Sequence, residues 1–247
     1  MTPTKSATAK PALRKRGRRP IHLQLDLKPV FRETIVDRVY AQLRDLVIRG
    51  QLRPGVTYTI RGLARAVGTS AMPVRSVLHM LVAEGALEVL PNRSVRVPLV
   101  SAERYAELCA IRAALEGLAA SMAAQNAPPG LAMQLKAVNA EYVTALAGTD
   151  RQPIFDANRQ FHFMLYAHSG APALLRLIET VWLLTGPYVN VTFANQTASN
   201  KAKSDHARII RAVTRRDPET CRAAIEKDIR DACHFTIQQL HRQAAKS

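Results

Sequence analysis

The chain has 247 residues, enough for one large domain or two modest ones, and 47% of them are apolar. Lys and Arg outnumber Asp and Glu by 18 to 6 in residues 1–100, but only by 17 to 13 in residues 101–247. This uneven charge indicates that the first half binds a polyanion. No apolar run is long enough to span a membrane and the start is too polar for a secretory signal, so we expect no membrane contact and a cytoplasmic location.

The cysteine pattern points the same way. Cys109, Cys221 and Cys233 show no paired spacing. An odd and scattered set fits a reducing cytoplasm, and the sequence therefore argues against a disulfide scaffold.

Residues 1–20 contain seven Lys or Arg and no acidic residue, and such a segment cannot bury a core. We expect residues 1–30 to form a basic, flexible arm. Two roles stay open for it, a solubilising tail or an arm that lies along phosphates or in a minor groove.

The next segment has the pattern of three short helices. Apolar residues recur at helical spacing from Arg32 to Arg49, and Gly50 ends the run. Thr59 can cap a second helix that ends before Gly68, and Ser70 a third that ends at Gly85. The apolar residues at helical spacing in the first helix are Ile35, Val39, Leu43, Leu46 and Val47. In the third helix we expect a buried stripe of Val74, Val77, Leu78, Leu81 and Val82.

The third helix exposes a polar face and precedes a hairpin. With its apolar stripe inward, Ala71, Arg75 and His79 fall on the opposite side. Two strand-like runs, 86–90 and 95–97, then flank a turn at 91–94. This order predicts a winged helix-turn-helix over residues 31–98, whose third helix enters the major groove of DNA.

Beyond Ser101 the pattern is helical throughout. We expect an all-α bundle over residues 101–244, and thus a mainly α fold, with a pocket between its helices. The polar stretch 195–200 is one of the expected breaks. The predicted helices lie near 102–125, 129–148, 151–169, 172–187, 203–215 and 218–244.

The order and spacing of these segments resemble the GntR family of transcription regulators, in the FadR-like branch with an FCD-type effector domain. The resemblance covers nearly everything after residue 30. It implies a homodimer that binds an inverted-repeat operator in double-stranded DNA and responds to a small organic-acid effector. Repression of catabolic genes is the commonest role, and activation is the alternative. The segments that carry the likeness are VYAQLRDLVIRGQLRPG (39–55), MPVRSVLHMLVAEGALEVLPNRSVRV (72–97), IRAALEGLAA (111–120), NRQFHFML (158–165) and DHARIIRAV (205–213).

The resemblance places the DNA contacts of this chain on four residues, which are Arg61, Ser70, Arg75 and Arg93.

Three neighbouring positions depart from the family pattern. Ala71 stands where the family usually has Arg, Met72 where it has Thr, and Ser94 where the wing has Gly. A lost base-reading Arg removes about 1–3 kcal/mol of discrimination, so we expect an operator unlike the common one.

The second half holds a candidate metal site. Asn158 and His162 share a helix face at a spacing of four residues. His206 and Asp228 each lie 11 residues from Asp217, so two antiparallel helices that turn there would bring them level. Two imidazoles and a carboxylate suit zinc, nickel, manganese or iron. The alternative is a metal-free polar pocket that binds a small molecule directly.

In the resembling family the four metal positions are typically Asp, His, His and His, so in this chain the carboxylate has moved from the first position to the last. Asn158 is a weak neutral ligand that can instead orient a water or the effector. Arg112 and Glu116 also share a helix face. They can form a structural ion pair, but the family has a similar pair there, so Arg112 is a candidate effector-binding residue.

Parts of the sequence are also compatible with two other functions. A metal-dependent hydrolase or oxygenase could use His162, His206 and Asp228. However, the sequence shows no convincing general base, nucleophile or phosphate loop beside them, so we expect no enzyme. A third interpretation treats the metal only as a staple of the bundle.

Overall fold

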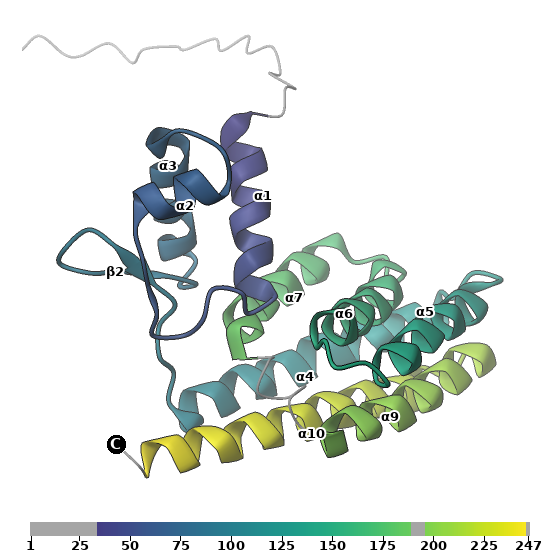
Figure 1. Cartoon of the computed structure of the whole chain (residues 1–247). Helices are drawn as coiled ribbons and strands as arrows, with labels where there is room; N and C mark the ends of the chain where they lie inside the picture. The colour runs from purple at the N-terminus through teal and green to yellow at the C-terminus, as the bar shows by residue number, and fades with distance from the viewer. Residues whose placement is uncertain (1–33, 189–195, 246–247) are drawn as a thin grey trace, which may run out of the picture. The chain divides into compact units, whose positions relative to one another are not determined.

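The computed structural model describes residues 34–188 and 196–245 (Figure 1). The predicted basic arm, residues 1–30, lies outside the described residues. The rest combines a three-helix unit that carries a small sheet with a bundle of longer helices. The mainly α fold is therefore confirmed.

The three predicted N-terminal helices are present as α1 (Ile35–Ile48), α2 (Ile60–Ala66) and α3 (Ala71–Ala83). Thr34 and Asp37 form a reciprocal capping box at α1. Thr59 caps α2 as expected, because its hydroxyl accepts from the backbone N–H of Gly62. Ser70 holds the N-cap position of α3, but its side chain makes no capping hydrogen bond.

The apolar stripes of α1 and α3 form the core of this unit, and only Val82 of the predicted stripe is not fully buried. Ile35, the first residue of α1, is 54% exposed. Leu46 and Val82 are only partly buried. The fully packed residues are Val39, Leu43, Val47 and Ile48 on α1 and Val74, Val77, Leu78 and Leu81 on α3.

The wing is a three-stranded antiparallel sheet in the order β1-β3-β2. Strands β2 (Glu88–Val89) and β3 (Val95–Arg96) lie within the predicted hairpin but are shorter. Strand β1 (Thr57–Tyr58) was not predicted. Two residues between a turn and a helix cap show no alternation, so only pairing with β3 reveals the strand.

The C-terminal part contains the predicted helices. Helix α9 begins inside the polar stretch that was predicted to be a break, because polar residues without Gly or Pro do not stop a helix. The elements are α4 (Ala102–Gln125), α5 (Leu131–Ala145), α6 (Gln152–Ala167), α7 (Pro172–Thr185), the 3-10 turn η1 (Gly186–Tyr188), α9 (Gln196–Arg215) and α10 (Pro218–Ala244).

Helices α4 and α10 pack along each other over most of their length (Figure 1). Small residues on α4 allow this, because Ala119, Ala120, Ala123 and Ala124 are completely buried. Gly117 has the same role, since a Cβ there would lie 2.8 Å from Cγ of Glu226. The close approach places the side chains of α4 and α10 around a common cavity.

The structure also corrects the prediction for the cysteines. Cys109 of α4 and Cys233 of α10 are joined by a disulfide, and Cys221 is a buried free thiol. A spacing of 124 residues gave no sign of this pairing, because it depends on the packing of two long helices.

Within the described residues no single helix is long and apolar enough to cross a membrane. Helices α2 and α3 pass such a test only as a pair, and they meet at a bend of 110°.

Candidate functional site

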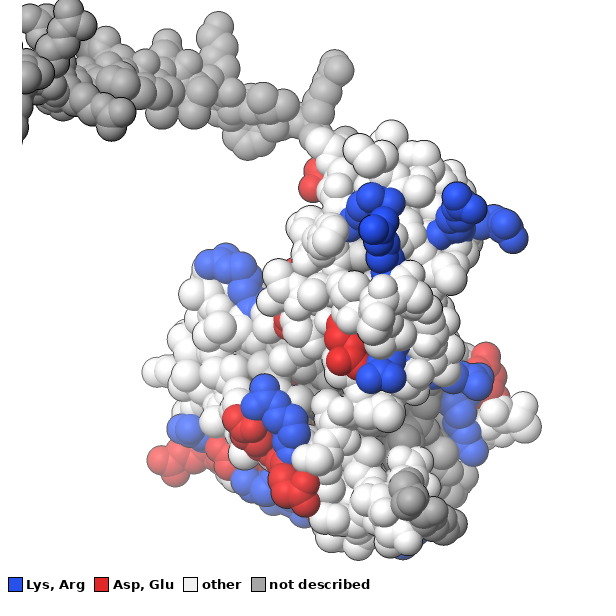
Figure 2. Space-filling model, turned by 90° about the vertical axis from the view of Figure 1, so that its left-hand side faces the viewer, with Lys and Arg blue, Asp and Glu red and all other residues white. Residues whose placement is uncertain are grey.

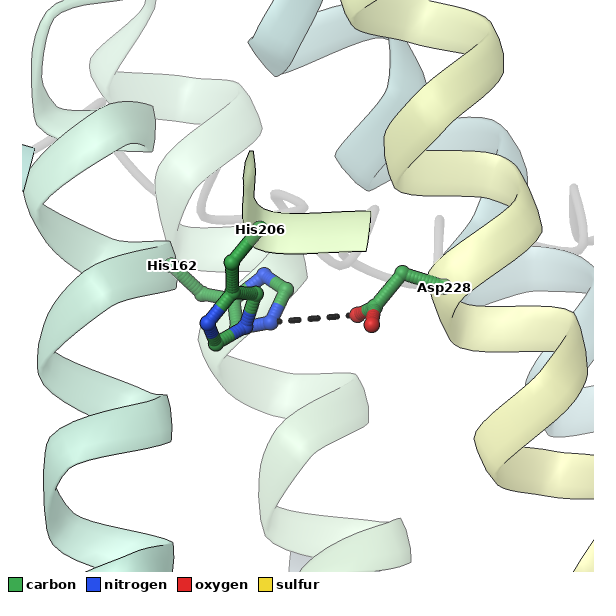
Figure 3. A group of neighbouring side chains, drawn as sticks. All are labelled: His162, His206 and Asp228. Carbon is green, nitrogen blue, oxygen red and sulfur yellow. Dashed lines mark ion pairs between the residues drawn. The ribbon is translucent and has the colours of Figure 1, made fainter. Parts of the chain in front are cut away.

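Three of the predicted ligands meet in the C-terminal bundle. His162 comes from α6, His206 from α9 and Asp228 from α10, and all three are buried. Each offers one ligand atom, and these atoms lie within 4.8 Å of one another. Figure 3 shows both imidazoles facing the carboxylate. The turn at Asp217 thus brings His206 and Asp228 together, as their equal spacing from it predicted.

His206 is held with one ring nitrogen ready to bind a cation. Its Nδ1 lies 2.9 Å from Oδ1 of Asn139, which can only accept, so Nδ1 carries the proton. Nε2 is buried and has no hydrogen-bond partner among the described residues. Burial lowers the pKa of His206 to about 3, so the ring is neutral near pH 7 and its Nε2 lone pair is available.

His162 is oriented by a second hydrogen-bond chain. Tyr166 donates its hydroxyl proton to Oε2 of Glu116 at 2.8 Å, and its oxygen lies 2.9 Å from Nδ1 of His162. The Nδ1–H of His162 therefore donates to Tyr166, and Nε2 faces Asp228. Burial raises the pKa of Tyr166 well above its usual value, with the charge of Glu116 adding to the effect, so the phenol keeps its proton.

Asp228 completes the group. Its Oδ2 lies 3.2 Å from Nε2 of His162. Burial alone would raise the pKa of Asp228, but its hydrogen bond with His162, in which a proton lies between Nε2 and Oδ2, and the positive charges around it lower the pKa below its usual value. The carboxyl group is thus an anion near pH 7. A metal that binds Nε2 and Oδ2 would displace this proton. An anion with two oriented imidazole nitrogens is the donor set that first-row divalent metals prefer, so the residues fit a metal.

Two of the three ligands, His162 and Asp228, open on a small cavity in the bundle. His162, Asp228, Asn158 and Arg112 line it together with Trp182. Its free volume is about 50 Å³. That is room for roughly three water-sized groups, so a larger ligand requires side chains to move. Asn158 lies in the cavity wall one turn before His162, as predicted from their spacing.

Arg112 forms the predicted ion pair and also lines the cavity. Its Nε donates to Oε1 of Glu116 at 2.7 Å, which is the expected ion pair. The guanidinium also lies 4.6 Å from the ring centre of Trp182 and lines the cavity. Glu116 therefore joins Arg112 to Tyr166, and through it to His162.

Sequence reasoning missed three supporting residues. Tyr166 follows His162 by four residues, so its helical spacing was a usable signal. Asn139 and Trp182 lie on α5 and α7, and no spacing in the sequence connects them with the site.

The predicted DNA-contacting residues lie on the N-terminal unit. Arg61, Ser70, Arg75 and Arg93 are all exposed, and the three arginines form no ion pair with any acidic residue in the described part of the chain. In Figure 2, basic side chains stand apart on the upper region, whereas basic and acidic groups alternate below. Unpaired arginines on one unit form a surface that suits phosphates.

The wing turn has an unusual backbone. Arg93 has a φ of 62°, a left-handed conformation that is uncommon outside glycine. Asn92 supports the turn, because its Oδ1 accepts from the backbone N–H of Ser94 at 3.1 Å and from the Ser94 hydroxyl. The turn thus holds Arg93 at the exposed tip of the wing.

Two family models match the chain. Residues 35–97 match the model described as "Bacterial regulatory proteins, gntR family", and residues 107–231 match the FCD domain. The second match covers the three clustered ligands and Arg112.

The chain is also similar to individual proteins. It is 28% identical over 195 residues to the HTH-type transcriptional regulator McbR of Escherichia coli K12, covering 78% of this chain and 88% of McbR. It is 28% identical over 194 residues to a probable D-xylose utilization operon transcriptional repressor of Paenarthrobacter nicotinovorans, covering 76% and 84%. A solved structure of E. coli McbR/YncC aligns with a TM-score of 0.79 at 27% identity, over 84% of this chain and 99% of that chain.

Proposed function

This chain belongs to the GntR family of bacterial regulatory proteins, with an FCD domain, and is a DNA-binding transcription regulator rather than an enzyme. We propose that it binds an inverted-repeat operator as a homodimer and that a metal-assisted organic-acid site in the FCD domain controls this binding. The clustered donors of His162, His206 and Asp228 carry the proposal. The domains proposed are an arm at 1–30, a DNA-binding domain at 31–98 and an effector and dimerisation domain at 101–244.

The DNA-binding part of the proposal rests on the third helix. Arg75 is exposed on the face of α3 opposite its buried stripe, where a recognition helix meets base edges. Ser70 and Arg61 lie near the helix starts, where phosphates bind, and Arg93 sits at the tip of the wing. Ala71 and Met72 cannot read bases as Arg and Thr do, so the operator differs from the common family sequence.

A divalent metal is proposed because it would change the charge of the cavity. Asp228 and Glu116 are carboxylates and Arg112 is a guanidinium, and a proton lies between His162 and Asp228, so the group is formally neutral. A divalent cation that displaces this proton makes the charge plus one, and zinc, nickel, manganese and iron all fit the donors. A carboxylate effector would be attracted to the cavity only in the second case. His162, His206 and Asp228 would hold the metal, with Asn158 and Arg112 positioned to meet the effector.

Helix α6 offers a route from this site to the DNA-binding unit. It carries Asn158 and His162 on the cavity side. It also carries Asp156, which pairs with Arg49 at 2.8 Å, and Arg159, which pairs with Asp45 at 2.7 Å. Arg49 and Asp45 belong to the end of α1. A shift of α6 on ligand binding would change both ion pairs, and an effector acts by favouring one of two such arrangements.

The remaining parts of the proposal follow from this role. A two-fold dimer matches an inverted repeat, since each winged helix reads one half-site. We propose that the protein acts in the cytoplasm, where bacterial DNA is, and that it represses catabolic genes. The basic arm is proposed to add phosphate contacts. The relative from Paenarthrobacter nicotinovorans, which is described as a probable repressor of an operon, supports repression.

Footprinting of the full chain on duplex DNA from upstream of its own gene tests the proposal. We expect one protected region with two halves related by a two-fold axis, about one or two helical turns apart. Protection that spreads evenly over the duplex, or a single protected half-site, would contradict an operator read by a dimer.

A further inference from the structure

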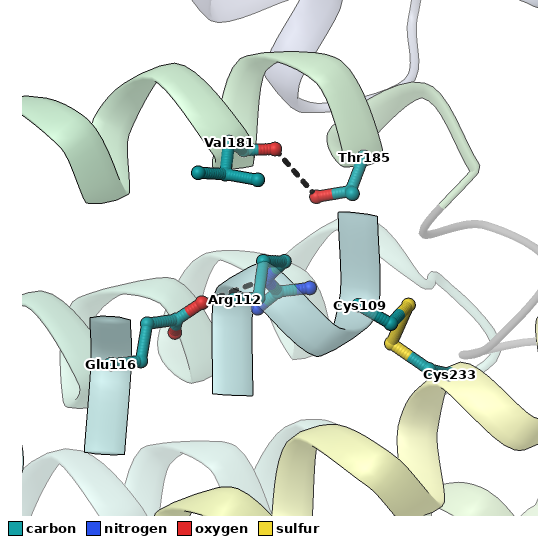
Figure 4. Close-up of a disulfide and its surroundings, with 6 residues drawn as sticks. All are labelled: Cys109, Arg112, Glu116, Val181, Thr185 and Cys233. Atoms are coloured by element: carbon teal, nitrogen blue, oxygen red, sulfur yellow. Dashed lines mark hydrogen bonds and ion pairs between the residues drawn. A yellow bond between two sulfur atoms is a disulfide. The ribbon is translucent and has the colours of Figure 1, made fainter. Parts of the chain in front are cut away.

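The disulfide joins the two helices that carry the cavity's charged groups. Cys109 lies on α4, three residues before Arg112, and Cys233 lies on α10, five residues after Asp228. The two Cα atoms are 6.2 Å apart, and Figure 4 shows the bond next to the Arg112–Glu116 pair. The bond therefore fixes the separation of α4 and α10 close to the candidate metal and effector site.

This bond also forms a boundary between the cavity and the surface. Cys233 lines the inner cavity. Cys109 and Cys233 together line a groove on the outer side, with a volume of about 450 Å³, between α4 and α10. Small residues of α4, among them Ala106 and Ala110, form one wall of this groove. The two cysteines are only 5% and 3% exposed, but both line this groove, so a small reagent would approach their sulfur atoms from the groove and not through the cavity.

We propose that Cys109 and Cys233 form a reversible oxidation site that takes a peroxide as oxidant and sets the affinity of the neighbouring site for its ligand. In the cytoplasm, where we propose that the protein acts, disulfides are usually transient or redox-sensing rather than structural. The second part of the proposal, the effect on affinity, rests on the proposed metal site, whereas the oxidation site itself does not.

The chemistry balances with hydrogen peroxide. One thiolate attacks a peroxide oxygen, the O–O bond breaks, and a sulfenic acid and hydroxide form. The second thiolate attacks the sulfenic sulfur, and the S–O bond breaks with release of a second hydroxide. The two hydroxides take up the two protons that the thiols lost and become water. In total, two thiols and one hydrogen peroxide give one disulfide and two waters. A dithiol reductant returns both thiols and becomes a disulfide itself.

The third cysteine provides a contrast on the same helix. Cys221 is completely buried on α10 and is a free thiol. Burial raises the pKa of its thiol to about 12, so almost no thiolate is present near pH 7. We therefore expect peroxide to leave Cys221 unchanged and to oxidise Cys109 and Cys233, which line the groove and lie close enough to bond each other.

Oxidation is expected to tighten ligand binding. In the disulfide form the three ligand atoms already lie within 4.8 Å of one another. The cross-link restricts the motion of α10, which carries Asp228, against α4, which carries Arg112. A site that is held in its binding arrangement loses less freedom when the ligand binds.

The first experiment counts thiols in the purified full chain. The protein is reduced with dithiothreitol, desalted, treated with a small excess of hydrogen peroxide, and then alkylated under denaturing conditions. Mass spectrometry should find three alkylated cysteines before peroxide and one, at Cys221, afterwards, with a peptide that links Cys109 to Cys233. Three remaining thiols, or cross-links only between chains, would overturn the oxidation site. Cys221→Ala should form the same cross-link, and Cys109→Ser should not.

The second experiment measures the affinity for Mn²⁺ in both redox forms. Mn²⁺ is chosen because thiols are poor ligands for it. Trp182 is the single tryptophan of the chain and lies in the cavity wall, so its fluorescence reports on binding. We expect the oxidised protein to bind at least about five-fold more tightly than the reduced protein. Cys109→Ser and Cys233→Ser should each bind Mn²⁺ with the same affinity before and after peroxide treatment.

Equal Mn²⁺ affinities in the two redox forms of the natural chain would overturn the effect on the site. The absence of Mn²⁺ binding in both forms would overturn it together with the proposed metal. The thiol count requires neither metal nor DNA, so it decides the oxidation site separately from the proposed function.

Discussion

Nε2 of His162 lies 3.2 Å from Oδ2 of Asp228, so these two candidate ligand atoms face each other directly. The opposite nitrogen of His162 is already engaged by Tyr166. A metal would thus bind between an imidazole and a carboxylate whose orientations are fixed in advance, and buried partners of this kind tune metal affinity strongly.

Removal of His206 should abolish tight metal binding. His206→Ala deletes the nitrogen that has no partner among the described residues, and we expect the dissociation constant for Mn²⁺ to rise about 100-fold or more. Titration followed by the fluorescence of Trp182 measures this change. His234→Ala, which alters an exposed histidine on α10, is the matched control and should bind as the natural chain does.

Replacement of Asn158 by aspartate should have opposite effects with and without metal. Asn158→Asp adds a buried carboxylate to a cavity that already contains Asp228. In the presence of a chelator the two like charges should lower the melting temperature, because an unpaired buried charge is unfavourable. With excess Mn²⁺ the added ligand should raise the melting temperature above that of the natural chain under the same conditions. A lower melting temperature in both conditions would show that Asn158 does not face the metal.

Folding stability of the metal-free protein should fall as the pH is lowered below about 6.5. The pKa of His206 is lowered from 6.5 to about 3 in the folded chain, chiefly by burial. Between these values the unfolded chain binds a proton that the folded chain does not, so acid favours unfolding. The expected slope from this residue is about 1.4 kcal/mol per pH unit.

Urea unfolding with a chelator, at several pH values between about 5 and 7, measures that slope. His206→Gln lacks the titrating ring and should show a slope that is shallower by about one proton. Identical slopes in the two proteins would mean that His206 is not held neutral by burial.

Loss of Arg75 should reduce sequence discrimination more than general affinity. Arg75→Ala removes the exposed guanidinium of α3, and we expect specific binding to weaken by about 1–3 kcal/mol. Binding to random duplex should change much less. The measurement compares the affinities for both duplexes at one salt concentration. Arg65→Ala, which removes an exposed arginine near the C-terminal end of α2, is a matched control. Equal losses on both duplexes would assign Arg75 to phosphate contact.

The sequence predicted those features that depend on local pattern. The stripe of Val74, Val77, Leu78 and Leu81 identified α3 and its exposed face, because helical spacing alone decides which side is buried. The equal spacing of His206 and Asp228 from Asp217 predicted their meeting, because a single turn joins their helices.

Features that depend on distant packing could not be predicted. The Cys109–Cys233 bond joins positions 124 residues apart, and only the packing of α4 on α10 brings them together. Asn139 belongs to α5 and reaches His206 through contact between α5 and α9. Strand β1 has only two residues, so its sequence shows no alternating pattern and only its pairing with β3 defines it as a strand.

We propose above all that the buried group of His162, His206 and Asp228 in the FCD domain controls the affinity of the winged helix for DNA. The most direct test measures the affinity for duplex from upstream of the chain's own gene at about 150 mM salt, with chelator and with Mn²⁺. We expect a change of at least about five-fold between the two conditions in the natural chain, and none in His206→Ala. The same metal response in both proteins, or no preference for this duplex over random sequence, would contradict the account.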